Sequence, residues 1–257
     1  MVTAQDFSGL PNLDTLDLSK NSLNDESFVS NSLSLLMCLY NLIQNLTLLK
    51  NLDLGNNQLS DVPALPPSLE VLKMNTNELG ALGPHCFTGL VNLLNLELLG
   101  NTLHEAAVSP SAFRALENLL SLQVDQNHFT SVPLGLPRSL QMLKMSGNMI
   151  DSVTEEALRG CSNLRLLDLS GNQLHEQSIP ANAWTHLKSL EALDLSSNQL
   201  ESVPANLPRR LRKLTLRNNN IGHVPAVSFR HLRPGLQSLQ LSHNRLGDGS
   251  ADRASFV

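Results

Sequence analysis

The chain of 257 residues carries 18 Lys and Arg against 23 Asp and Glu, a formal net charge of -5, and aromatic residues make up only 4% of it. This acidic balance excludes a global basic field for nucleic acid. The most apolar segment, residues 33–43, has about half of the ~20 residues that a membrane-spanning helix needs, and no signal-peptide pattern opens the chain.

One phrase, Leu-x-x-Leu-x-Leu-x-x-Asn-x-Leu, recurs ten times when conservative variants are counted. From the second copy onward its asparagines are 20, 24, 26, 21, 24, 26, 21 and 25 residues apart, which is an order of short, long, long. A period of about 20–29 residues is the signature of a leucine-rich solenoid. The asparagines of the phrase are Asn21, Asn57, Asn77, Asn101, Asn127, Asn148, Asn172, Asn198, Asn219 and Asn244.

Each Leu-x-Leu pair predicts a short strand, because a period of two sends both leucines inward and the residue between them outward. Each strand is expected to pair in parallel with the strand of the next repeat. The asparagine that follows is expected to bond backbone groups of the neighbouring coil, so that the ten form a ladder. In chain order, the outward residues of the predicted strands are Asp17, Asp53, Lys73, Glu97, Gln123, Lys144, Asp168, Asp194, Thr215 and Gln240.

The segments between the strands alternate in character. Long repeats carry an aromatic residue or a leucine that would fill the other half of the core, and short repeats carry proline pairs that force extended backbone. We therefore expect an α/β-type solenoid: a leucine-rich repeat horseshoe with a concave parallel β-sheet and convex 3-10, polyproline or irregular segments, forming a single domain over residues 1–257. The core-filling residues are Phe87, Phe113, Leu158, Trp184 and Phe229, and the paired prolines are Pro63 with Pro66 and Pro67, Pro133 with Pro137, and Pro204 with Pro208.

Residues 24–48 break the repeat. The first two asparagines are 36 residues apart, and the excess is interpreted as a looped insertion, a partner contact or an imperfect sequence record. Beside it, Asn45-Leu46-Thr47 is the one glycosylation sequon, which makes Asn45 a candidate glycosylation site. The three cysteines include no CxxC pair, which argues against a zinc site or disulfide framework, and Cys86 and Cys161 are expected to be buried apolar fillers.

The chain resembles the small leucine-rich proteoglycans, an extracellular family with the same short-long-long order. The resemblance implies secretion, residence in the extracellular matrix, and binding to collagen, heparin-like glycosaminoglycans or cell-surface receptors, without catalysis. Members carry capping cysteines near both ends, and their absence here predicts a chain truncated at both ends. The segments that carry the resemblance are VPALPPSLEVLKMNTNEL (Val62–Leu79), VPLGLPRSLQMLKMSGNMI (Val132–Ile150), AWTHLKSLEALDLSSNQL (Ala183–Leu200), VPANLPRRLRKLTLRNNNI (Val203–Ile221) and PGLQSLQLSHNRL (Pro234–Leu246).

The predicted concave face offers one candidate ligand surface. Asp168 and Asp194 would be close neighbours, because adjacent strands lie about 4.8 Å apart. They lie beside Lys213, Thr215 and Arg217, and the five side chains together would form a surface that recognises basic groups on a collagen or a receptor. The alternative is that these positions are polar only because they face solvent.

A dense basic run offers a second candidate. Five basic residues lie within nine positions of an otherwise acidic chain: Arg209, Arg210, Arg212, Lys213 and Arg217. Clustered arginines suit sulfate or carboxylate groups through forked, charge-assisted hydrogen bonds, which indicates a glycosaminoglycan site. A solvated turn is the alternative interpretation. Further basic residues follow in the next repeat: Arg230, His231 and Arg233.

No catalytic, cofactor-binding or metal-binding residue is predicted. The pairs His104-Glu105 and His175-Glu176 lie 71 residues apart at equivalent repeat positions, too far from each other to share an ion, and repeat ancestry explains them. The sequence thus favours a non-enzymatic matrix protein module that binds collagen or heparin-like chains and supports cell–matrix adhesion. Alternatives are an ectodomain fragment of a leucine-rich repeat receptor and an intracellular leucine-rich repeat adaptor.

Overall fold

A computed structural model describes residues 10–25, 43, 46–225 and 228–250. The chain divides into two compact units, unit 1 (residues 1–128) and unit 2 (residues 129–257). The candidate glycosylation site Asn45, most of the irregular 24–48 stretch and Cys38 lie outside the described residues. The single domain over residues 1–257 stays a prediction.

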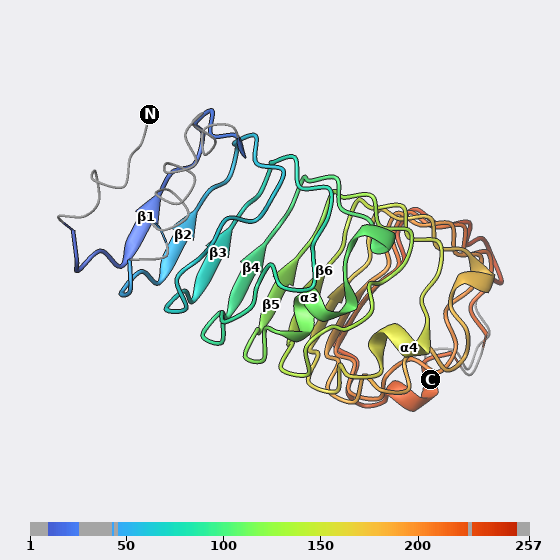
Figure 1. The fold of residues 1–257 in the computed structure, drawn as a ribbon. Coiled ribbons are helices and arrows are strands. Elements are labelled where there is room, and N and C mark those ends of the chain that lie inside the picture. Colours follow the sequence, from blue (N-terminus) through green and yellow to red (C-terminus); the bar gives the residue numbers. More distant parts are fainter. Residues whose placement is uncertain (1–9, 26–42, 44–45, 226–227, 251–257) are drawn as a thin grey trace. The chain divides into compact units, whose positions relative to one another are not determined.

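Unit 1 contains five short parallel strands that lie side by side in chain order (Figure 1). The middle residue of each is a buried leucine, and the two residues beside it face the other way, as the period-two pattern predicts. The strands are β1 (Thr15–Asp17), β2 (Asn51–Asp53), β3 (Val71–Lys73), β4 (Asn95–Glu97) and β5 (Ser121–Gln123).

Unit 2 repeats this arrangement with five further parallel strands in chain order. Their middle leucines stand in register from strand to strand, so each coil stacks its apolar side on the next. The strands are β6 (Met142–Lys144), β7 (Leu166–Asp168), β8 (Ala192–Asp194), β9 (Lys213–Thr215) and β10 (Ser238–Gln240). The predicted parallel-sheet solenoid of leucine-rich repeats is confirmed. In both units we call the side that bears the first and third residue of each strand the sheet face.

The segments opposite the strands are short helices or extended backbone. Ser109 and Thr154 cap α3 and α4, because their hydroxyl oxygens accept hydrogen bonds from backbone N–H groups of the first turn. The rings of Phe87 and Phe113 stack at 6.3 Å between centroids in unit 1. The helices are η2 (Glu105–Ala107), α3 (Pro110–Arg114), α4 (Glu155–Leu158), η3 (Glu176–Ser178) and η4 (Arg230–Leu232).

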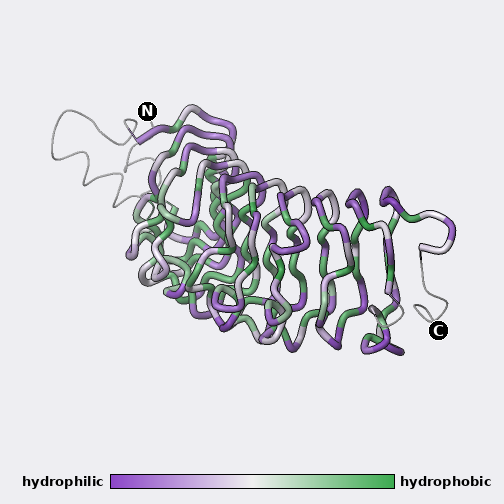
Figure 2. The backbone as a smooth tube through the Cα atoms, turned by 90° about the vertical axis from the view of Figure 1, so that its right-hand side faces the viewer, coloured by the Kyte–Doolittle hydropathy of each residue, from purple (hydrophilic) through white to green (hydrophobic). Residues whose placement is uncertain are grey.

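The core lies between the strands and these segments, and Figure 2 shows its hydrophobic residues along the inner side of the coils. All five predicted core-filling residues of the long repeats are buried. Cys161 is fully buried, as expected of an apolar filler, but Cys86 is only half-buried and departs from that expectation. Cys86 lies in a turn, next to the fully buried Phe87.

The asparagines of the repeated phrase join each coil to its neighbours. Asn172 is typical: its side-chain N–H groups donate to the carbonyl oxygens of Met145 and Leu169, both at 3.0 Å, and its Oδ1 accepts from the backbone N–H of Ile150 at 2.9 Å. One side chain thereby satisfies backbone groups that a buried turn would otherwise leave without partners. The pattern weakens at its ends, where Asn21 is exposed and Asn244 half-buried.

Candidate functional site

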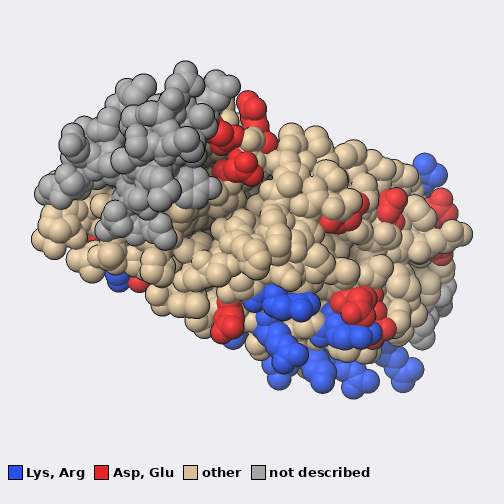
Figure 3. All heavy atoms as spheres, in the orientation of Figure 1, with Lys and Arg blue, Asp and Glu red and all other residues tan. Residues whose placement is uncertain are grey.

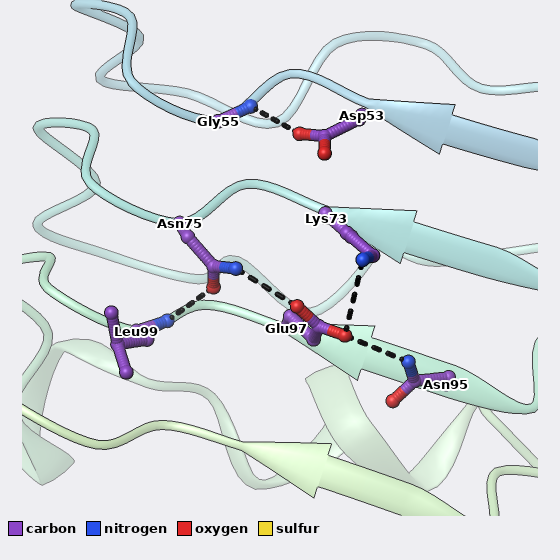
Figure 4. A network of polar contacts seen from close by, with 7 residues as sticks. All are labelled: Asp53, Gly55, Lys73, Asn75, Asn95, Glu97 and Leu99. Atoms are coloured by element: carbon purple, nitrogen blue, oxygen red, sulfur yellow. Dashed lines mark hydrogen bonds and ion pairs between the residues drawn. The ribbon is translucent and has the colours of Figure 1, made fainter. Parts of the chain in front are cut away.

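The sheet face of unit 1 carries a polar network whose charges satisfy one another (Figure 4). Glu97 accepts from Asn75 at 2.9 Å and from Asn95 at 3.0 Å, and its carboxylate lies 3.8 Å from Nζ of Lys73. Asn75 in turn accepts from the backbone N–H of Leu99 at 2.9 Å. Both oxygens of the central carboxylate are thus occupied, which leaves this part of the face little capacity for a charged ligand.

The sheet face of unit 2 differs, because only one oxygen of each of its two aspartate carboxylates accepts hydrogen bonds from described residues. Asp168 and Asp194 are paired in register on β7 and β8. Oδ1 of each accepts from the backbone N–H of a serine two residues further on, Ser170 or Ser196, at 2.9 Å, and also from that serine's hydroxyl. Within the described ranges, Oδ2 of neither aspartate has a hydrogen-bond or ion-pair partner.

These aspartates line a cavity of about 130 Å³ that opens across β6 to β9. Its floor includes Leu166 and Ala192, the first residues of β7 and β8, which are Cα partners in register. The next residue in that row is Lys213, and the row begins with Met142. Alanine is the smallest side chain of the four, so the cavity lies where Ala192 leaves space between larger neighbours.

Two lysines and one hydroxyl complete the rim of the cavity. Lys144 is the register partner of Asp168, and Lys213 begins β9. Neither ammonium lies within 4.0 Å of a carboxylate in the part of the chain that the structure describes. Thr215 is only 4% exposed, and its hydroxyl has no hydrogen-bond partner among those residues. A buried hydroxyl without a partner carries a free-energy cost, so its position on a cavity calls for a physical reason.

The residues of the predicted basic run do not all lie in one place. Strand β9 places Lys213 on the sheet face, and Nε of Arg217 donates to the hydroxyl of Ser242 at 2.8 Å in the next coil. Arg209 instead lines an open groove of about 500 Å³ on a different part of unit 2. The groove is completed by residues from the following repeat: Arg230, His231 and Arg233.

We call Arg209, Arg230, His231 and Arg233 the basic groove. Figure 3 shows Lys and Arg side chains gathered along the lower edge of that view, with Asp and Glu side chains beside some of them. Nε2 of His231 donates to the carbonyl oxygen of Leu207 at 2.9 Å, which fixes the imidazole at the groove. In the described segments no acidic group lies within 4.0 Å of the three guanidinium groups.

Two features of these sites are not evident from the linear sequence. The first is the small side chain of Ala192, which becomes apparent when the strands are stacked in register and their first residues are compared. The second feature is that Arg209 joins the arginines of the following repeat rather than its own neighbours in sequence. That grouping depends on the path of the backbone between β9 and β10.

The second His-Glu pair, His175-Glu176, has a local role. Nδ1 of His175 accepts from the backbone N–H of Gln177 at 3.3 Å, which caps η3. Across the described residues, no group of three or more His, Cys, Asp or Glu side chains is arranged to hold a metal ion. In that same part of the chain, no helix is both long and apolar enough to cross a membrane.

Comparison with protein families gives leucine-rich repeat models over residues 130–174 and 209–253, with further leucine-rich repeat models over 163–187 and 186–203. Podocan-like protein 1 of Mus musculus is 40% identical over 252 residues, which is 98% of this chain and 43% of that protein. Lumican of Mus musculus is 36% identical over 199 residues, which is 77% of this chain and 58% of lumican. The chain thus spans about half the length of these relatives.

Among solved structures, a chain of the octameric complex of latrophilin 3, Unc5D and FLRT2 is 29% identical with a TM-score of 0.87, and the match covers 96% of this chain and 72% of that one. A chain of the TLR13–ssRNA13 complex is 25% identical with a TM-score of 0.77, and the match covers 93% of this chain and 34% of that one.

Proposed function

The chain belongs to the leucine-rich repeat family, with small leucine-rich proteoglycans such as lumican among its relatives, and from this membership we propose that it is a non-enzymatic module of the extracellular matrix. It binds a heparin-like glycosaminoglycan through the basic groove and a matrix protein such as collagen through the sheet face of unit 2, and thereby supports cell–matrix adhesion. The relatives support the matrix setting, and the geometry of unit 2 supports the two binding surfaces.

The observation that carries this proposal is a groove lined by three guanidinium groups, with no acidic group within 4.0 Å of them among the described residues. Guanidinium is charged at every physiological pH and presents forked donors that match sulfate and carboxylate oxygens. Three like charges that converge on one groove repel one another, and an anionic chain laid along the groove would relieve that repulsion. The groove is open rather than enclosed by side chains, which suits a linear polymer that enters from the side.

The test is the NaCl concentration at which the full chain elutes from immobilised heparin. We compare three triple alanine variants that remove the same charge. The groove variant changes Arg209, Arg230 and Arg233, and it is expected to elute at roughly 0.1 M lower NaCl or more, because salt screens such contacts. The run variant changes Arg210, Arg212 and Lys213, and the dispersed control changes three other exposed arginines: Arg114, Arg165 and Arg245.

The run variant and the dispersed control are expected to elute close to the unmodified chain. If the run variant shifts and the groove variant does not, the linear run is the site and the groove assignment is wrong. Equal shifts of all three variants would mean that only net charge matters. An unmodified chain that does not bind heparin at physiological salt would overturn the glycosaminoglycan part of the proposal.

The likeness to a chain from the latrophilin 3, Unc5D and FLRT2 complex favours a second candidate, an ectodomain of a leucine-rich repeat receptor. The intracellular adaptor is the third. The complete transcript separates the three: a signal peptide with capping cysteines supports the matrix protein, and an added membrane-spanning helix supports the receptor. A complete open reading frame without either would support the adaptor.

A further inference from the structure

We propose that the cavity across β6 to β9 is a docking pocket for a lysine or arginine side chain of a partner protein. This inference rests on the part of the proposed function that assigns protein binding to the sheet face of unit 2, and it names the chemical group that this face recognises. The pocket is about 130 Å³, which is the scale of one side chain rather than of a whole ligand.

The first argument is the pair of carboxylates on the rim. Asp168 and Asp194 stand on adjacent strands about 4.8 Å apart, each with an oxygen that has no partner within the described residues. Their Oδ1 atoms are held by Ser170 and Ser196, so the carboxylates are fixed before a ligand arrives. Two fixed acceptors at this spacing match the several N–H donors of one ammonium or guanidinium group.

The second argument is the floor. Leu166 and Ala192, two residues before the aspartates on the same strands, add an apolar surface to the cavity that the carboxylates line. Lysine and arginine bury their methylene stems against such surfaces while the charged head stays at the polar rim. A bare metal ion would gain nothing from this floor, and an uncharged apolar side chain would leave both carboxylates unpaired. The combination therefore selects a cation with an aliphatic stem.

The third argument is the hydroxyl of Thr215. It lines the same cavity, is nearly completely buried and has no partner in the described part of the chain. A hydroxyl can accept one more N–H from a bound cationic head, which would resolve the unsatisfied group. The other acidic pair on a sheet face, Asp17 and Asp53, lacks these features, since the residues before it are Thr15 and Asn51, which bond each other.

The lysines that line the cavity do not pair with its two carboxylates. Lys144 and Lys213 line the cavity, yet the described residues show no ion pair from either to the aspartates. Their charges also disfavour occupation by a small free cation without further contacts. A partner side chain adds the contacts of its own backbone and neighbours, which a free cation cannot.

The experiment titrates the isotopically labelled full chain with two short peptides, acetyl-Gly-Lys-Gly-amide and acetyl-Gly-Gln-Gly-amide, and follows backbone amide resonances by NMR. The lysine peptide is expected to shift the resonances of Ser170 and Ser196, and the glutamine peptide is expected to bind at least about tenfold more weakly. Asp168→Asn with Asp194→Asn should weaken the lysine peptide by a similar factor. Asparagine keeps the Oδ1 acceptor that holds each turn, so the fold is retained.

Two further variants separate binding from structure. Ala192→Leu keeps both carboxylates but fills the floor, and Leu166 and Met142 already show that a large side chain fits this register position. It should abolish binding of the lysine peptide. Thr215→Val should weaken the peptide several-fold without lowering stability, because it removes an unpaired hydroxyl. The matched control, Asp17→Asn with Asp53→Asn, should bind as the unmodified chain does.

Equal binding of the two peptides would overturn the inference, as would unchanged binding by Ala192→Leu. So would shifts of the same resonances by CaCl2 alone while both peptides leave them in place, since the cavity would then be a metal site. Elution from heparin is measured on the same variants. If the aspartate variants keep their heparin elution but not the peptide, the pocket and the glycosaminoglycan groove are independent, and either proposal can fail without the other.

Discussion

Replacing Asn172 by alanine should destabilise unit 2 strongly, although the removed side chain is small. Its Oδ1 is the one partner of the backbone N–H of Ile150, so the substitution leaves a buried donor without a partner. An orphaned buried group costs about 1–3 kcal/mol, and the lost side-chain donations add about 1 kcal/mol. The carbonyl oxygens of Met145 and Leu169 each keep a second asparagine donor, which limits the loss. We expect a total of about 2–4 kcal/mol.

The matched control is Asn21→Ala, at the same position of the repeated phrase. Asn21 is exposed, and its hydrogen bonds to described residues go to Leu18 and Ser19 within its own coil, so its loss should be below about 1 kcal/mol. Urea unfolding followed by far-ultraviolet circular dichroism gives the free energy of unfolding of each variant. If Asn172→Ala lowers the free energy of unfolding no more than Asn21→Ala does, hydrogen bonds between coils are not the source of the stability that Asn172 contributes.

Two further predictions concern titratable groups. Burial raises the pKa of the Cys161 thiol to about 11, so about one molecule in a thousand carries the thiolate at pH 8. A thiol reagent should therefore modify Cys161 only after urea is added. Rapid modification of Cys161 in the folded chain would contradict its burial. The hydrogen bond from His186 holds the pKa of the Glu155 carboxyl below its ordinary value of 4.5. The ionised carboxylate therefore contributes its full stabilisation above pH 4.5, and this stabilisation is lost as the pH falls through the lowered pKa. The urea midpoint of Glu155→Gln should lie below that of the unmodified chain at pH 6, and the two should converge as the pH falls well below 4.5. A difference that persists in acid would show that the Glu155–His186 contact is not electrostatic in origin.

The strands were predictable because their signal is local. A strand such as Leu166–Asp168 is specified by alternation within a few residues, and its register follows from the constant interval between repeats. The core-filling aromatic residues followed from the same logic, since Phe113 and Phe229 occupy equivalent places and are both buried. Cys86 is only half-buried although the adjacent Phe87 is fully buried, so position in the repeat alone did not predict the exposure of each residue there.

The candidate sites were harder to predict, because they depend on what lies beside a residue in the neighbouring repeat. The pairing of Asp168 with Asp194 could be read from the repeat interval, but the cavity beneath them arises from the volume that Ala192 lacks relative to Leu166. The basic groove joins Arg209 to side chains more than twenty residues away. A run of like charge in the sequence does not by itself tell which residues share a surface, because alternate side chains of a strand point to different faces.

The most direct test of glycosaminoglycan binding by the basic groove is surface plasmon resonance of the full chain on immobilised heparin. The groove variant and the Asp168→Asn, Asp194→Asn variant are measured in parallel. We expect the groove variant to bind heparin much more weakly at physiological salt, and the aspartate variant to bind it at least as well as the unmodified chain. Undiminished binding by the groove variant would contradict the assignment of a glycosaminoglycan site to Arg209, Arg230 and Arg233.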